Sequence, residues 1–432
     1  MNSTYRTASR RAPIDLPAFG LLPMAGARIG GQTGPMTRTA PASPFDLPPR
    51  ADCFGPDHDA LRRSVAAFVA REISPFVAEW DEAGTFPRAL YRQAADLGLL
   101  GLGYPEELGG TPTDLFGSLA AAEEIARAGS GGVQASLGSH HIALPPIVAL
   151  GSEALKRRVV PPVLAGEKIA ALAITEPGGG SDVAALRTTA RLAGDHYVVD
   201  GEKTFITSGM RADVLTVAVR TDPAQRGAGG VSLLVIDGDT PGLTRSPLKK
   251  TGWWASDTAH LRFSGCRVPA AHLLGEEGQG FKAILRNFNH ERLVMAASAV
   301  GYAMACTEEA LGWARERRTF GQALVEHQVI RHKLVDMVRH AEAARAVVHD
   351  LAWRLMRGAG DEAALVARTC LAKIQATQAM EFCTKEAVQI LGGMGYMRGS
   401  KSERLYREAK VMVIGGGSEE VMKDLAARQL GL

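Results

Sequence analysis

The spacing of hydrophobic residues changes twice along the chain, and this restricts the fold more than any other feature. From residue 57 to 165 apolar residues recur at helical spacing. From 169 to about 274 they alternate with a period of two, and no helix-length pattern interrupts them, which favours an antiparallel barrel or sandwich. From 280 onward the helical period returns in long runs joined by short glycine-containing loops, as in an antiparallel four-helix bundle.

These patterns predict individual elements. N-terminal helices are expected at 88–97, 114–128, 133–150 and 153–164, after a first one that begins near Leu61. Strands are expected at 169–174, 188–192, 196–207, 214–220, 231–236 and 260–263. Bundle helices are expected at 281–317, 327–357, 362–391, 402–413 and 419–429. The chain is therefore predicted to be α+β and mostly α, with an N-terminal helical domain (51–168), a middle antiparallel β domain (169–278) and a C-terminal four-helix bundle (279–432).

Residues 1–50 differ from the rest in composition. They are rich in Pro, Gly, Ser, Thr and Arg, with Asp15 as the one acidic residue before Asp46. Such a segment cannot bury enough apolar surface to fold alone, so we expect a disordered or artefactual tail, with a true start at Met36 as one explanation. A transit peptide is the alternative, although four prolines would break its amphipathic helix. A bacterial cytoplasmic protein is expected, or a mitochondrial-matrix protein if the segment is a transit peptide.

Composition excludes several classes of protein. The 432 residues carry a formal net charge of +3 and no basic run with interleaved aromatic residues, which argues against nucleic-acid binding. No apolar stretch approaches the roughly 18 residues of a transmembrane helix. The five cysteines are odd in number and lack CxxC spacing, which indicates reduced intracellular thiols. The eleven histidines, including His140 and His141, lack metal-ligand spacing, so we expect surface or capping roles and no metal.

The stretch 174–182 reads I-T-E-P-G-G-G-S-D and follows an apolar, strand-like run. Glycine lacks Cβ and tolerates positive φ, so the backbone here can approach a flat or anionic ligand. An ordinary glycine-rich turn is the alternative. The hydroxyls of Thr175 and Ser181, at fixed offsets from the glycines, favour a cofactor turn.

A carboxylate falls on an apolar helix face in the run after Gly280. Ile284, Phe288, Glu291, Met295 and Ser298 share one face of the expected helix. Burial among such groups would raise the pKa of Glu291 towards the range of a general base. An ion pair with Arg292, or with an arginine of a neighbouring helix, is the alternative. The stretches 315–321 and 391–396 likewise have ordinary explanations, as a helix end with cations and glycine and as a flexible loop.

Taken together, these motifs resemble the acyl-CoA dehydrogenase family of flavoproteins from about Asp57 to the C-terminus. Besides I-T-E-P-G-G-G-S-D they include, in order, D-G-E-K-T-F-I-T-S-G (200–209), A-S-D-T-A (255–259), G-E-E-G-Q-G-F (275–281), E-R-R-T-F-G (316–321), Q-I-L-G-G-M-G-Y (389–396) and Y-R-E-A-K (406–410).

The resemblance implies FAD between the β domain and the bundle. Its implied contacts within one subunit are Leu172, Ile174, Thr175, Gly180, Ser181, Phe205, Thr207, Ser418 and Glu420. Phe205 stands where the family usually has Trp, which keeps an aromatic face but loses an indole N–H. A second subunit would complete the site with Arg317, Phe320, Gln389, Gly392 and Gly393, which implies a homo-oligomer, most often a tetramer.

The resemblance also locates the catalytic base. Many members carry it as a Glu shortly after Y-R-D-A-K, and the matching residue here is Gly416. Members similar to isovaleryl-CoA and long-chain acyl-CoA dehydrogenases carry it on the first bundle helix before an Arg, which is the position of Glu291. The missing carboxylate at Gly416 and the unexpected one at Glu291 account for each other.

The implied reaction is α,β-dehydrogenation of an acyl-CoA thioester. Glu291 would take the α-proton, the hydride would pass to the flavin, and the Gly416 N–H would bind the thioester oxygen. Ser181, Arg292, Gly415 and Gly416 would contact the substrate, and electrons would pass to electron-transfer flavoprotein. A flavin monooxygenase or oxidase on the same fold, or a non-catalytic acyl-CoA-binding relative, are the alternatives. Trp253 and Trp254 have no assigned role beyond core packing.

Overall fold

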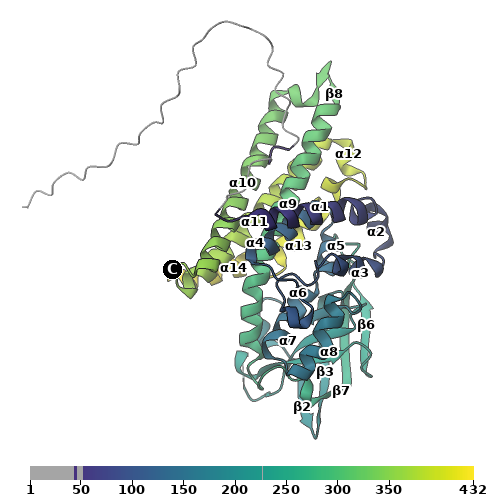
Figure 1. The fold of residues 1–432 in the computed structure, drawn as a ribbon, viewed down its shortest axis with the longest axis vertical. Helices are drawn as coiled ribbons and strands as arrows, with labels where there is room; N and C mark the ends of the chain where they lie inside the picture. The colour runs from purple at the N-terminus through teal and green to yellow at the C-terminus, as the bar shows by residue number, and fades with distance from the viewer. Residues whose placement is uncertain (1–42, 46–51, 226) are drawn as a thin grey trace, which may run out of the picture. The chain divides into compact units, whose positions relative to one another are not determined.

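The computed structural model describes residues 43–45, 52–225 and 227–432. Helices come first, then a curled sheet, then a helical bundle, which confirms the predicted α+β class (Figure 1). The predicted disordered tail lies outside the described residues except for 43–45. There Phe45 packs into the bundle core, so disorder is wrong for these three residues because an apolar side chain gains by burial.

The N-terminal part is helical, in short elements. They are α1 (Pro56–Phe68), the π-helical turn η1 (Val69–Ile73), α2 (Val77–Ala83), α3 (Ala89–Asp96), η2 (Glu106–Leu108), α4 (Leu115–Ala126), α5 (Gly131–Leu137), α6 (His140–Ala143), α7 (Pro145–Leu150) and α8 (Glu153–Leu164). The single helix predicted for 133–150 is wrong, because Gly138 ends α5 and Pro145 begins α7.

The surface role expected for His140 is also wrong, since this buried side chain donates to the Leu100 carbonyl at 2.8 Å.

Seven strands form the middle sheet. They are β1 (Ala170–Ala173), β2 (Thr189–Ala193), β3 (His196–Thr207), β4 (Val214–Arg220), β5 (Val231–Asp237), β6 (Leu243–Pro247) and β7 (Thr258–Pro269). The order is β1-β4-β2-β3-β7-β6, and β5 also pairs with β4. The pairing is mainly antiparallel as predicted, but β4 pairs in parallel with β1 and, at one residue, with β2. The intervening strands form a connection long enough to bring β4 back parallel to β1. Sequence patterns missed β6 because its side chains, which are half-buried or exposed, lack apolar alternation.

Long helices make up the C-terminal bundle. They are α9 (Gly280–Glu316), α10 (Gln328–Arg357), α11 (Glu362–Leu391) and α13 (Lys401–Ile414), with the shorter α12 (Gly393–Tyr396) and α14 (Glu419–Leu430). A hairpin of β8 (Arg318–Thr319) and β9 (Gln322–Ala323) joins α9 to α10. Short 3-10 turns complete the chain: η3 (Val183–Ala185), η4 (Gly227–Gly230), η5 (Ala270–His272) and η6 (Leu324–Glu326).

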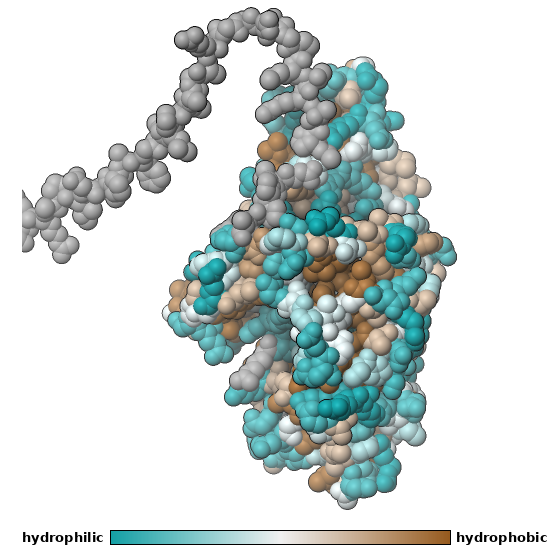
Figure 2. Space-filling model, viewed as in Figure 1, coloured by the Kyte–Doolittle hydropathy of each residue, from teal (hydrophilic) through white to brown (hydrophobic). Residues whose placement is uncertain are grey.

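The bundle core is rich in alanine, which lets helices approach closely. At Gly301 of α9 an added Cβ would lie 2.6 Å from the Glu123 carbonyl oxygen of α4, so this crossing requires glycine. All five cysteines are buried, and the described residues contain no disulfide. Hydrophobic residues gather across the middle of the face in Figure 2, where N-terminal helices lie over the bundle, and the β end is mainly hydrophilic.

A buried ion cluster joins α4 to α1 and α10. Glu123, only 2% exposed, accepts a hydrogen bond from His349 at 2.8 Å and lies 3.0 Å from Arg62 and 3.6 Å from Arg345. Burial alone would raise the pKa of Glu123, but the His349 hydrogen bond and the charges of His349, Arg62 and Arg345 lower it to about 2.

We expect Glu123→Gln to lower the free energy of unfolding by roughly 3 kcal/mol at pH 7, because it leaves buried cations without their anion. Glu153→Gln, at an exposed site, serves as the control, with a change within about 0.5 kcal/mol. The stabilisation by Glu123 is complete above pH 4.5 and disappears as the pH falls from there to about 2. Urea denaturation at pH 7 and pH 3 measures both effects. Equal losses in the two variants at pH 7 would contradict the role of the cluster.

Among the described residues, no helix combines the length and hydrophobicity needed to cross a membrane. The same residues include no group of three or more His, Cys, Asp or Glu side chains that could hold a metal ion.

Candidate active site

The glycine-rich stretch lies directly after β1, as predicted. Glu176 and Gly179 exchange backbone hydrogen bonds of 3.0 and 3.2 Å, which close a tight turn. None of the glycines 178–180 has a positive φ, so the expectation that they supply one is wrong. A Cβ at Gly178 would meet no atom within 4 Å, so the space over this part of the turn is open to a ligand. Gly180 and Ser181 are exposed, Thr175 is half-buried and Ile174 is buried, so Ile174 offers a ligand only its backbone.

A buried ion pair that sequence reasoning missed ties this turn to β3. Lys203, 0% exposed, donates to the Glu176 carboxylate at 2.8 Å and to the Ile174 carbonyl at 2.9 Å. Glu176 also accepts from the backbone of Arg187 and Thr188. Burial lowers the pKa of Lys203 to about 8, although Glu176 opposes the shift. The period-two pattern contains the signal, because Lys203 shares the parity of the inward-facing Tyr197 and Val199.

We expect Lys203→Met to cost about 3 to 5 kcal/mol of stability, because it leaves the Glu176 carboxylate buried and unpaired. Flavin content should fall with it, since the pair holds the glycine-rich turn. Lys249→Met, at an exposed site, is the matched control. Thermal unfolding and the absorbance of bound flavin after purification measure the two effects, and full flavin content in Lys203→Met would contradict this account.

An irregularity in β3 exposes Phe205. The register with β7 shifts between Lys203 and Ile206, as in a β-bulge, and Phe205 has a φ of +60° and 70% exposure. The Thr204 N–H donates to the Thr175 carbonyl at 2.8 Å, which holds this part of β3 beside the glycine-rich turn. Thr207, two residues on, is half-buried, as is Leu172 of β1. An aromatic face is thus available next to the turn.

Glu291 lies on α9 without the ion pair that was its alternative explanation. Its Oε2 atom is buried and has no hydrogen-bond partner among the described side chains. Arg292 and Lys373 act on Glu291 through their charges, without a direct ion pair among these side chains. Arg292 instead donates to the Gly416 carbonyl at 2.9 Å and to Asn289 at 3.1 Å. Burial raises the pKa of Glu291 to about 7, against the lowering charges of Arg292 and Lys373. A carboxyl group of this kind suits proton transfer near neutral pH.

The loop 415–417 between α13 and α14 lies against the same stretch of α9. Gly416 has a φ of +67° and Gly417 a φ of +108°. A Cβ on Gly416 would lie 2.8 Å from the sulfur of Met295, one helical turn beyond Glu291. The fold therefore brings Gly416 next to the helix face of Glu291, although more than a hundred residues separate them.

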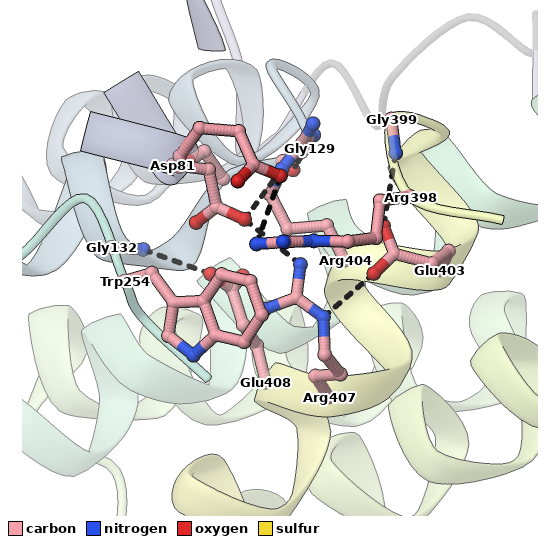
Figure 3. A network of polar contacts seen from close by, with 12 residues as sticks. Asp81, Gly129, Gly132, Trp254, Arg398, Gly399, Glu403, Arg404, Arg407 and Glu408 are labelled. Atoms are coloured by element: carbon pink, nitrogen blue, oxygen red, sulfur yellow. Dashed lines mark hydrogen bonds and ion pairs between the residues drawn. The ribbon is translucent and has the colours of Figure 1, made fainter. Parts of the chain in front are cut away.

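A polar network anchors α13, the helix that leads into this loop (Figure 3). Glu408 accepts the backbone N–H groups of Gly131 at 2.7 Å and Trp253 at 3.2 Å. Arg407 reaches Asp81 of α2 at 2.8 Å. Trp253 packs partly on the bundle core, as expected. For Trp254 that expectation is wrong, because its ring lies between the guanidinium groups of Arg398 and Arg407, at 4.2 and 3.8 Å.

The remaining predicted cofactor residues divide into two groups. Ser418 caps α14, where its hydroxyl accepts from Val421 at 3.4 Å, and Glu420 is exposed in the first turn of that helix. The residues assigned to a second subunit are all exposed: Arg317, Phe320, Gln389, Gly392 and Gly393.

Two of these sit in local structures that the sequence left open. Phe320, 99% exposed, is in the β8–β9 hairpin after α9 ends at Glu316, and the stretch 393–396 is a short helix rather than a loop. Figure 1 shows β8 at the end of the bundle away from the sheet, so one chain does not bring Phe320 to the glycine-rich turn.

The groups exposed near β1 and β3 fit a flavin. An exposed aromatic ring at Phe205, an accessible turn at 178–180 and the exposed Ser181 hydroxyl provide a stacking face and hydrogen-bonding groups for a flat, polar ring system. The Glu291 carboxyl group, with its Oε2 buried, lies on the part of α9 that the Gly416 loop contacts.

Comparison with known proteins agrees with this geometry. Models of the N-terminal, middle and C-terminal domains of acyl-CoA dehydrogenases match residues 55–167, 171–266 and 278–431. The mouse mitochondrial short-chain specific acyl-CoA dehydrogenase is 36% identical over 375 residues, which cover 86% of this chain and 90% of the relative. The pig mitochondrial long-chain specific enzyme is 36% identical over 379 residues, 87% of each chain.

Solved structures agree as well. A crystal structure from Mycobacterium smegmatis, described as an acyl-CoA dehydrogenase, superposes with a TM-score of 0.85 at 46% identity and covers 88% of this chain and 98% of that one. This chain therefore belongs to the acyl-CoA dehydrogenase family of flavin-dependent oxidoreductases.

Proposed function

We propose that the protein oxidises acyl-CoA thioesters to trans-2-enoyl-CoA, with Glu291 as the base and FAD as the oxidant. The observation that carries the proposal is the Glu291 carboxyl group, whose Oε2 is buried and unpartnered on the part of α9 that contacts the Gly416 loop. The family's usual base position has no side chain at Gly416, so the base must be another carboxylate, and Glu291 lies on the stretch of α9 that the Gly416 loop contacts.

Proton removal is the step that the chain's own residues explain. The α-proton passes to Glu291, and the electrons of that C–H bond form the double bond as the β-hydrogen leaves as hydride. FAD, when bound, supplies the acceptor for this hydride. The Gly416 N–H donates to the thioester oxygen, where negative charge develops, and one such donor is worth about 3 kcal/mol in a water-excluded site. Because Glu291 must be ionised, the rate rises with pH through the pKa of about 7.

FAD binding is proposed to need two subunits. In one subunit, the FAD would be held by Leu172, Ile174, Thr175, Gly180, Ser181, Phe205, Thr207, Ser418 and Glu420. The second subunit would supply the exposed residues Arg317, Phe320, Gln389, Gly392 and Gly393. These residues lie on bundle ends, which a second copy can bring to the FAD site of the first. A homotetramer that passes electrons to electron-transfer flavoprotein is the form we expect; the cytoplasmic location stays a prediction.

The acyl group would lie beside the glycine loop. Ser181 and Arg292 would contact the CoA side, and Gly415 and Gly416 remove two side chains from beside the reacting carbons, which leaves room for a long or branched chain. Equal identity of 36% to a short-chain and a long-chain specific relative does not select a length.

Anaerobic titration of the purified flavoprotein with acyl-CoA thioesters tests the reaction class. We expect bleaching of the oxidised flavin and a product two mass units lighter than the substrate. A monooxygenase or oxidase would instead need oxygen for product formation, and a non-catalytic binding protein would bind CoA esters without bleaching. Either result would overturn the proposal.

A further inference from the structure

A buried lysine on α11 contacts the glycine loop instead of a carboxylate. Lys373 is 1% exposed, and its ammonium donates to the Val413 carbonyl at 2.8 Å and the Gly417 carbonyl at 2.9 Å. Among the described side chains it forms no ion pair. A buried ammonium of this kind is costly, and burial lowers the pKa of Lys373 to about 8. The two carbonyl dipoles only partly offset the free-energy cost of burying the ammonium. We therefore expect Lys373 to have a role beyond stability.

The two carbonyls held by Lys373 stand at the two ends of the loop. Val413 lies in the last turn of α13, and Gly417 directly precedes the Ser418 cap of α14. The three glycines 415–417 restrict the backbone little by themselves, and two of them have positive φ. Arg292 holds the carbonyl of Gly416 between these two contacts. Cations from α9 and α11 thus hold three loop carbonyls, which limits the conformations open to the Gly416 backbone.

Resting on the proposed function, we propose that Lys373 is a positioning residue whose hydrogen bonds to the Val413 and Gly417 carbonyls hold the Gly416 loop, and with it the Gly416 N–H, in place against α9. Few charged groups act on Glu291 and Lys373 among the described side chains. Arg292, on its own helix, and Lys373, from α11, act on Glu291 and lower its pKa against burial. On Lys373 itself, the charge of Arg292 adds to the lowering of the pKa by burial, whereas Glu419 of α14 and Glu291 oppose it.

Three variants separate the charge from the hydrogen bonds. Lys373→Met removes both, Lys373→Gln keeps one amide donor without charge, and Lys373→Arg keeps the charge. The Glu291 carboxyl stretch, identified by its loss in Glu291→Gln, is titrated by infrared difference spectroscopy, so no turnover is needed. We expect the pKa of Glu291 to rise by about one unit in the Met and Gln variants and to stay near the wild-type value in the Arg variant. Lys385→Met, at an exposed site on the same helix, is the control and should leave it unchanged.

Two further measurements complete the test. Hydrogen exchange of residues 413–418 should accelerate in Lys373→Met, and flavin reduction by an acyl-CoA at pH 7 should slow about five- to tenfold, with its rising pH limb displaced upward. If Lys373→Met does not fold, the Gln variant decides the question alone. Unchanged hydrogen exchange of residues 413–418 in every folded variant would overturn the inference, because the loop would then not depend on Lys373. If no thioester reduces the wild-type flavin, the proposed function fails, whereas hydrogen exchange of residues 413–418 still supports or refutes the role of Lys373 in holding the loop.

Discussion

Flavin reduction by an acyl-CoA is expected to slow about 10³- to 10⁴-fold in Glu291→Gln, while FAD stays bound. The amide has nearly the shape of the carboxyl group but cannot accept the α-proton. Glu291 forms no direct ion pair among the described side chains, so the substitution leaves no cation without a bonded partner, although Arg292 and Lys373 lose a favourable negative charge. Stopped-flow absorbance under anaerobic conditions measures the reduction rate, and the flavin spectrum after purification measures cofactor content.

The matched control is Glu362→Gln, at the exposed start of α11, which should keep the wild-type rate. Binding of acyl-CoA to Glu291→Gln should also persist, because the proton acceptor contributes to the reaction more than to affinity. A wild-type rate of reduction in Glu291→Gln would move the base elsewhere, with Glu419 and Glu420 the next residues to test.

Gly416→Ala is expected to slow flavin reduction about 10- to 100-fold, the second largest effect. At a φ of +67° a Cβ is strained, which costs on the order of 1–2 kcal/mol, and it would lie 2.8 Å from the Met295 sulfur. The loop or the end of the Met295 side chain must then shift, and the strained backbone displaces the N–H that we propose binds the thioester oxygen. The same stopped-flow measurement applies, with the KM for acyl-CoA recorded alongside.

Gly415→Ala provides the comparison for this effect. Gly415 has an ordinary φ of −66°, and its added Cβ would lie 3.1 Å from the Val411 carbonyl and 3.7 Å from Met295. Only a small shift is needed, so we expect a loss of less than about threefold. If Gly415→Ala and Gly416→Ala had the same rate, backbone strain at Gly416 would not explain the requirement for glycine.

Most of the fold was predictable where one period ran for many residues. The bounds of β3, β4 and α11 match the patterns in the sequence, because long amphipathic or alternating runs define a single register. The prediction of one helix over 133–150 failed, since apolar residues recur on both sides of Gly138 and Pro145, while local backbone chemistry divides the segment into three short helices. The parallel pairing of β1 with β4 depends on the path of the chain between them, which periodicity does not record.

The candidate site was predictable only in part, for a similar reason. Glu291 stood out because it interrupts an apolar stripe, and Gly416 because it departs from a family motif. Lys203 and Lys373 did not stand out, because their partners lie on other elements: Lys203 meets Glu176 across the sheet, and Lys373 meets backbone carbonyls of a distant loop. Every residue type has a backbone carbonyl, so the sequence does not show which residues accept hydrogen bonds through it.

Single-turnover flavin reduction of the wild-type protein, across straight and branched acyl-CoA thioesters of increasing length, tests the central claim most directly. The account predicts rapid anaerobic bleaching by at least one thioester, with formation of the enoyl-CoA and a rate that increases with pH through about 7. The thioester that reacts fastest identifies the acyl group. A flavin that every thioester in the series leaves oxidised would contradict α,β-dehydrogenation as the reaction of this protein.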